Sequence, residues 1–308
     1  MRILTILRKW MRTHSLPGFF GIPIWDVFIF LVNELKREDI VTRANSIAYS
    51  FFLSLFPTII FMFTLLPYVP IHDLDEVIKN AIRQVMPVNA HAFLFETVES
   101  LTSIPRGGLL SVGFVLAVIF ASSGMLTLMR GFEKSYEVSF KARTYLTKRG
   151  IAIALTSFVG ISFIVSGTLI VTGDQLFGLL FGSDESSFVV SLIKWFALLL
   201  LFYSVIGVIY RFGPPLKRKF GMMSPGTTLA TVVSLMTSAA FTYIIDNFGT
   251  QSRVYGSLGA LIVILVWMQM NCFILLAGFE LNASIAVNRD LRQRKRSAAT
   301  LIHEHKVH

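Results

Sequence analysis

The sequence is short of the residue types from which most catalytic and cross-linked sites are built. It has one cysteine, Cys272, so no disulfide can form within the chain. It contains no Cys-x-x-Cys, His-x-Glu, His-Glu-x-x-His or Gly-x-Ser-x-Gly motif and no phosphate loop. The sequence therefore predicts no catalytic residues, no metal site, no cofactor and no enzyme.

Histidine and carboxylate patterns lead to the same expectation. All six histidines lie outside the long apolar segments, and three of them, His303, His305 and His308, gather at the C-terminal end. Such triplets arise by chance in terminal segments, so we expect no metal there. A nuclease needs clustered carboxylates or histidines to hold a metal and activate water, and the sequence assembles no such cluster.

Charged residues are also scarce, at 15% of the chain, whereas 54% of the residues are hydrophobic. The hydrophobic residues concentrate in six segments, each at least about 20 residues long, the length with which a helix crosses a bilayer core. None of the segments shows the alternation of a membrane β-strand. The sequence predicts an all-α polytopic membrane protein with six transmembrane helices. The segments are roughly 46–69, 107–129, 150–172, 188–210, 222–246 and 255–279.

Lysine and arginine are divided unequally between the two sides of these segments. The N-terminal stretch, the loops after the second and fourth segments and the tail hold 23 of them, and the other three loops hold four. Because positive loops stay in the cytoplasm, both termini are predicted to be cytoplasmic in a multi-pass protein of the bacterial inner membrane. The basic residues behind the net charge of +10 are then expected to face anionic lipid headgroups. Binding of nucleic acid by these residues is less favoured.

Three accessory pieces surround the predicted transmembrane domain, 46–283. The N-terminal segment 1–45 contains an amphipathic helix over 24–36, which either lies in the cytoplasmic interface or packs on the bundle. The external loop 70–106 has the caps and spacing of a small helical hairpin, which is either a lid over a cavity or a cap on helix ends. The tail 284–308 is basic and compatible with a helix.

Hydroxyl side chains recur in register within two spans. In the fifth span they are three or four residues apart and form one stripe along a helix. In the first span they precede Pro57, which frees a backbone carbonyl and is expected to bend the helix. Both stripes are either close-packing surfaces between helices or the polar wall of a cavity. The stripes are Thr227, Thr231, Ser234, Ser238 and Thr242, and Ser46, Ser50 and Ser54.

A few stronger polar groups lie deeper in the spans. Asn271 is near the middle of the sixth span, and Lys194 is about two turns inside the fourth. Asp246 and Glu280 end their spans near the interfaces, which weakens the usual presumption of function for intramembrane charges. We expect a substrate path lined by the first, fifth and sixth spans. Its candidate residues are Ser50, Ser54, Pro57, Lys194, Thr231, Ser234, Ser238 and Asn271.

Two stretches carry a family resemblance. AYSFFLSLFPTIIF at 48–61 and YGSLGALIVILVWMQMNCFILLAGFELNA at 255–283 resemble the first and last spans of the YihY/BrkB family of bacterial inner-membrane proteins. The segments 123–136 and 210–215 fall where that family has cytoplasmic loops, and the resemblance covers about 25–285. It implies six spans with both ends inside.

The resemblance implies less about function. Members carry the labels virulence factor BrkB and ribonuclease BN, and the absence of nuclease groups fits a misassignment of the second label. An envelope role is implied, with transport of a lipid or amphiphile as one form of it. Two classes stay open: a transporter or lipid translocator, and a non-transporting scaffold or envelope-assembly factor. A membrane-bound hydrolase is a distant third.

Overall fold

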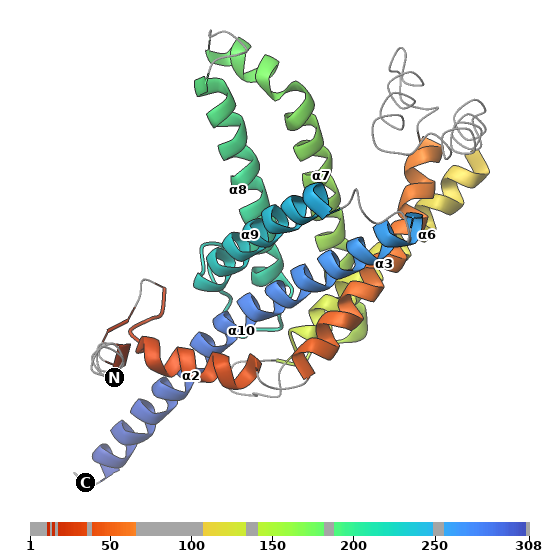
Figure 1. The fold of residues 1–308 in the computed structure, drawn as a ribbon. Helices are drawn as coiled ribbons and strands as arrows, with labels where there is room; N and C mark the ends of the chain where they lie inside the picture. The colour runs from red at the N-terminus through yellow and green to blue at the C-terminus, as the bar shows by residue number, and fades with distance from the viewer. Residues whose placement is uncertain are drawn as a thin grey trace. The chain divides into compact units, whose positions relative to one another are not determined.

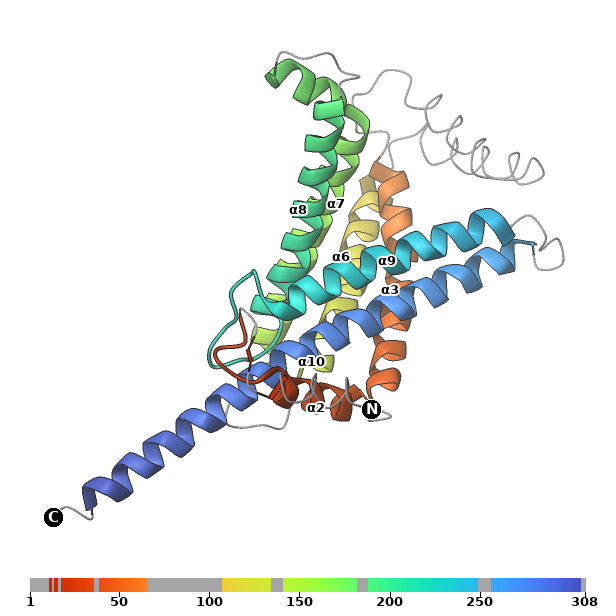
Figure 2. The same ribbon diagram turned by 60° about the vertical axis from the view of Figure 1, so that its left-hand side comes forward.

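The part of the chain that the structure describes folds mainly into helices (Figures 1 and 2). The computed structural model describes residues 11–12, 14–15, 18–35, 39–65, 107–133, 141–181, 188–248 and 256–305. All regular elements of these ranges are helices. They are α2 (Ile24–Leu35), α3 (Asp39–Leu65), α6 (Gly107–Gly131), α7 (Tyr145–Phe181), α8 (Phe188–Phe212), α9 (Pro225–Phe248) and α10 (Gly256–His305).

Six of the described helices, α3 and α6 to α10, are long and apolar enough to cross a membrane. The predicted all-α class with six spans is therefore confirmed. The orientation of the termini stays a prediction. The predicted external hairpin at 70–106 lies outside the described residues.

The larger of two compact units comprises 1–48 and 125–308. Within it, α7 pairs with α8 and α9 pairs with α10, while α8 also contacts α9, and α2 contacts α10. Figures 1 and 2 both show α7 and α8 side by side as one hairpin, and α9 and α10 as another. Short connections favour such antiparallel neighbours.

The smaller unit comprises 49–124 and contains most of α3 and the first part of α6. Its two helices approach closely where Gly124 lies under the ring of Phe51, which a Cβ at position 124 would meet at 2.8 Å. Further along, the rings of Phe61 and Phe114 lie 5.4 Å apart. A small residue opposite an aromatic one lets these helices pack without a gap.

The core of the larger unit surrounds the middle of α10. Every side chain from 278 to 287 except Leu281 is buried, which is unusual for a helix with apolar and polar residues on all its faces. By contrast, the spans carry many exposed large apolar side chains, such as Phe163 at 73% and Trp195 at 63% exposure. Such surfaces are stable in lipid, where apolar exposure costs nothing.

The N-terminal helix packs on this core. Val27 of α2 is buried whereas Phe28 is half exposed, so one side of α2 faces the bundle. Before α2, the chain turns sharply at Gly18 and Gly21, whose φ angles of +86° and +74° suit glycine. At the other end, α10 continues without a break past residue 283, so the tail begins as part of the buried core.

Candidate functional site: a polar cluster and a groove at the start of α9

A buried polar cluster holds the first turn of α9 against α10. Ser224 is the N-cap, and its Oγ accepts a hydrogen bond from the backbone N–H of Thr227 at 3.3 Å. From α10, the Asn282 amide accepts from the Gly226 N–H through Oδ1 at 2.9 Å and donates to Ser224 Oγ at 2.9 Å. Pro225 has no N–H, so the cluster satisfies the helix start without a ligand.

Two glycines bring the backbones of α9 and α10 together beside this cluster. A Cβ on Gly278 would lie 2.8 Å from the Gly226 carbonyl oxygen, 2.9 Å from Ala230 Cβ and 2.5 Å from the hydroxyl oxygen of Tyr210. That hydroxyl, which comes from α8, donates to the Leu275 carbonyl at 2.6 Å. The crossing of α8, α9 and α10 therefore depends on the lack of a side chain at 278.

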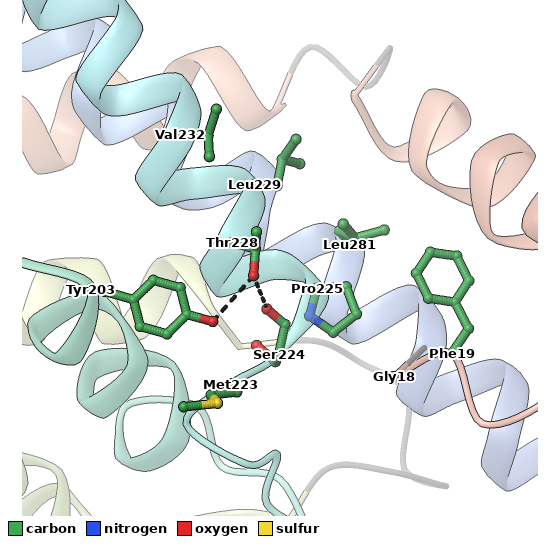
Figure 3. A pocket seen from close by; sticks show the side chains of 10 residues that line it. All are labelled: Gly18, Phe19, Tyr203, Met223, Ser224, Pro225, Thr228, Leu229, Val232 and Leu281. Carbon is green, nitrogen blue, oxygen red and sulfur yellow. Dashed lines mark hydrogen bonds between the residues drawn. The ribbon is translucent and has the colours of Figure 1, made fainter. Parts of the chain in front are cut away.

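A groove of about 650 Å³ opens next to the cluster (Figure 3). This volume is within the range of about 300–1,000 Å³ usual for small-molecule pockets. Its walls are mostly apolar and come from α8, α9, α10 and the turn before α2. The lining residues are Gly18, Phe19, Tyr203, Met223, Ser224, Pro225, Thr228, Leu229, Val232 and Leu281.

Hydroxyl groups supply the polar part of the groove. Tyr203 Oη and Thr228 Oγ1 lie 3.1 Å apart, and Thr228 Oγ1 donates to the Ser224 carbonyl at 3.3 Å. Figure 3 shows Tyr203 and Ser224 converging on Thr228. With Thr228 donating to Ser224, Tyr203 donates to Thr228, and the lone pairs of Tyr203 Oη stay available to a ligand that donates.

A second, smaller groove of about 280 Å³ lies between the later part of α9 and the earlier part of α10. Trp267 Nε1 donates to Ser238 Oγ at 3.2 Å across it. Apart from Ser238 and Thr242, its walls are apolar. They are formed by Ser238, Phe241, Thr242, Ile245, Val263, Ile264 and Trp267.

An ion pair is buried at the meeting of α3, α6 and α10. The Glu280 side chain has no solvent exposure, and its Oε1 lies 3.5 Å from Arg43 Nη1. The same Arg43 nitrogen donates to the Gly131 carbonyl at 2.8 Å, and Arg43 Nε lies 3.3 Å from Asp39 Oδ2. Around Glu280, every α10 side chain from 278 to 287 except Leu281 is buried.

A basic loop residue, Arg143, caps the end of α8. It donates to the carbonyl of Phe212, the last residue of α8, and to those of Gly213 and Pro214 just after it, at 2.9–3.2 Å. Burial lowers the pKa of Arg143 below its usual value, and the charge of Glu133 acts against this shift. Part of the positive charge on these loops thus stabilises helix termini.

Residues 31–302 match the profile of a family described as virulence factor BrkB. The chain belongs to this family. Among BrkB relatives, the ribonuclease-like protein YfkH of Bacillus subtilis is 30% identical over 254 residues, which cover 81% of this chain and 91% of the relative. A UPF0761 membrane protein of Haemophilus influenzae is 22% identical over 271 residues, 86% of this chain and 94% of the relative. No solved structure matches the chain.

The family match confirms the resemblance read from the first and last spans. It also places all the residues of the polar cluster and the ion pair, with the α9 stripe, within the matched range. The turn at Gly18 and Phe19, which closes one side of the larger groove, precedes that range.

The predicted hydroxyl stripe of this BrkB protein is divided between two environments. Thr227, Thr231 and Ser234 are buried, whereas Ser238 is half-buried and Thr242 is exposed at the second groove. Among the described residues, Thr231 Oγ1 finds no hydrogen-bond partner. The stripe is therefore a packing surface over its first half and a groove wall over its second.

The remaining predicted path residues lie in separate places. Asn271 donates its amide to the Trp267 carbonyl at 2.9 Å, one turn from the second groove. The Lys194 stem lies against Gly173 of α7. In the smaller unit, Ser54 is buried and donates to the Phe51 carbonyl at 2.6 Å, and Ser50 is half-buried.

Pro57 lies inside α3, where its freed carbonyl is that of Leu53. The next residue, Thr58, donates through Oγ1 to the Ser54 carbonyl at 2.7 Å, beside the freed carbonyl. The helix runs through the proline without a break, from Asp39 to Leu65.

Proposed function

We propose that this BrkB-family protein is a transporter or translocator of a lipid or another amphiphile, and that it catalyses no chemical reaction. The observation that carries the proposal is the larger groove, which combines apolar walls with a convergent hydroxyl group at one place. An amphiphile has the same two parts, an apolar chain and a polar head. Met223 and Val232 on its rim are 84% and 49% exposed, which is compatible with entry from the surrounding bilayer.

The two grooves lie along one helix. From Thr228 to Thr242 is about 20 Å along α9, at 1.5 Å per residue, or most of a bilayer core of about 30 Å. Between the grooves, Thr231 and Ser234 are packed inside the protein. We propose that this packed stretch separates two binding positions, and that an amphiphile passes when α9 and α10 part along the stripe.

Exposed basic residues lie in the loop between α8 and α9, shortly before the groove residue Met223 in the chain. Lys217, Arg218 and Lys219 are exposed there, and Lys219 Nζ lies 4.5 Å from the centre of the Phe212 ring. We propose that these residues lie at anionic headgroups on the cytoplasmic side, and that nucleic acid is not a partner.

A matched pair of substitutions tests the groove. The purified protein is reconstituted in vesicles that contain a fluorescent short-chain phospholipid, and its appearance in the other leaflet is measured. Leu229→Trp fills the groove, whereas Leu235→Trp changes the same helix at a residue of similar exposure, 43% against 37%, outside both grooves. Translocation is expected to fall for Leu229→Trp and to stay at the wild-type rate for Leu235→Trp.

A scaffold or assembly role is the second candidate, and one observation favours it. The first half of the stripe is packed, as a purely structural contact surface requires. A scaffold predicts that the wild-type protein gives no translocation above protein-free vesicles. It also predicts that Leu229→Trp still complements a deletion strain.

A further inference from the structure

The ion pair between Arg43 and Glu280 is placed unusually for a structural salt bridge. Glu280 lies within the apolar helix α10 and is fully buried, while the Arg43 side chain retains 18% of its exposure. A carboxylate at such a position is expensive to keep charged, so intramembrane acids mark sites of function.

Arg43 has a second set of partners already in place. Its Nε meets the carboxylate of Asp39, which is 71% exposed, and its Nη1 donates to the Gly131 carbonyl. In a typical buried pair, neutralising one partner leaves the other as an uncompensated charge. Here Arg43 keeps the Asp39 carboxylate and the Gly131 carbonyl as partners when Glu280 becomes neutral. The arrangement therefore tolerates both charge states of Glu280.

The pair also joins three helices. Arg43 is in the first turns of α3, Gly131 ends α6, and Glu280 belongs to α10. At the same junction, a Cβ on Gly131 would lie 3.1 Å from both Ile47 Cδ1 and Leu276 Cδ2, so the helices are in close contact. Losing the attraction between Arg43 and Glu280 removes a charged contact that holds α10 to the other two.

Several other titratable groups near this junction have partners of their own. The Tyr210 hydroxyl of α8 donates to the Leu275 carbonyl, Arg289 and Asp290 of α10 pair at 2.8 Å, and Glu133 pairs with Lys148 at 2.6 Å near the surface. Among the described residues Glu280 is thus the carboxylate that is both buried and placed between helices.

We propose that Glu280 is a proton-binding site, and that proton binding releases α10 from Arg43 and loosens the junction with α3 and α6. The proton adds to the Glu280 carboxylate and comes from the aqueous side on which Asp39 and Arg43 are exposed. Arg43 then remains with Asp39 and the Gly131 carbonyl. This site goes beyond the proposed transport function, because a scaffold can carry it equally well.

The single cysteine provides a native probe of this opening. Cys272 is two turns before Glu280 on α10 and is buried, so a thiol reagent reaches it only when α10 separates from its neighbours. The rate of maleimide labelling of the full chain in detergent is measured from about pH 8 to about pH 4, a range that includes ordinary glutamate titration near about 4.3. Glu280→Gln, a permanently neutral side chain, is measured in parallel.

Dividing the wild-type rate by the Glu280→Gln rate at each pH removes the intrinsic pH dependence of the thiol. The ratio is expected to be about one-tenth or less at high pH and to approach one at low pH, since the two proteins then have the same charge. A ratio that does not change with pH overturns the proposal. Glu133→Gln, which neutralises the surface pair, serves as the matched control and is expected to keep the wild-type profile.

A second measurement keeps the test valid if Glu280→Gln does not fold. Infrared difference spectra of the wild-type protein between the same pH limits are expected to show a protonated carboxyl band that hydrogen–deuterium exchange shifts slowly, as burial requires. In Arg43→Gln, that band is expected to be present already at the high-pH limit. Absence of a slowly exchanging carboxyl band in the wild-type spectra contradicts proton binding by Glu280.

Discussion

Substituting Gly278 by alanine tests the packing on which the groove rests. The added methyl group would lie 2.5 Å from Tyr210 Oη, 2.8 Å from the Gly226 carbonyl oxygen and 2.9 Å from Ala230 Cβ. None of these three neighbouring atoms can move away from the added methyl group without breaking other contacts. The Tyr210 hydroxyl is bonded to the Leu275 carbonyl, and the other two belong to the backbone and first atoms of α9. We therefore expect α9 to move away from α10.

The magnitude follows from three contributions. Overpacking of a dense interior costs about 1–3 kcal/mol. Displacing Tyr210 leaves a buried hydroxyl unsatisfied, for about another 1–3 kcal/mol. Alanine returns about 1 kcal/mol through its higher helix propensity. The net destabilisation is about 3 kcal/mol, roughly a hundredfold change in the ratio of folded to unfolded protein.

Thermal unfolding in detergent, followed by helix content and by Cys272 labelling, measures the effect. Gly160→Ala is the matched control, because a Cβ at this position in α7 meets nothing within 4 Å. It is expected to be neutral or slightly stabilising. Tyr210→Phe removes the atom nearest to the new methyl group, so it should cost less in the Gly278→Ala background than alone. Equal stability of Gly278→Ala and Gly160→Ala would refute the reasoning.

Three further predictions concern topology, activity and the stripe. Reporter fusions after residues 140, 216 and 300 should read cytoplasmic, and fusions after 90, 180 and 250 external, given the 23-to-4 division of Lys and Arg. An inverted neighbouring pair in that series would show that the spans are miscounted. Purified protein should not cleave RNA. Metal-dependent cleavage abolished by substituting a loop or span carboxylate would disprove this. Ser234→Leu, in the packed half of the stripe, should lower the yield of folded protein and function together. Ser238→Leu, in the second groove, should lower function alone. Complementation and thermal stability, measured for the same two variants, distinguish these results.

The spans were predictable because hydropathy and length are local properties of the sequence. Any helix of about 20 apolar residues can cross a bilayer, so the six segments needed no knowledge of their neighbours. The start of α9 also had a local signal, since Ser224 followed by Pro225 is a typical N-cap and first helical residue. The hydrogen bond from Asn282 to this N-cap had no local signal in the sequence, because Asn282 is 58 positions away from Ser224.

The burial of Glu280 could not be deduced from its position near the end of an apolar run. It depends on α3 and α6 meeting α10 at that level, a tertiary property. A usable hint was the spacing of Glu280, Asn282 and Ser284, which places polar groups on more than one face of one helix. The stripe shows the same limit. Its register was visible in the sequence, whereas the change from packed interface to groove wall beyond Ser234 depends on which α10 residues lie opposite, such as Trp267 at Ser238.

Photo-cross-linking locates a lipid bound to the protein. The protein is reconstituted with a phospholipid that carries a photoactivatable group in its acyl chain, and the labelled residues are identified by mass spectrometry. Labelling is expected to be stronger at the groove residues Met223, Leu229 and Val232 than at Phe163 of α7 and Trp195 of α8. These two controls lie outside the groove and are more exposed than Leu229 and Val232. Labelling of the groove residues at or below the level of the outer surface would contradict an amphiphile in the groove.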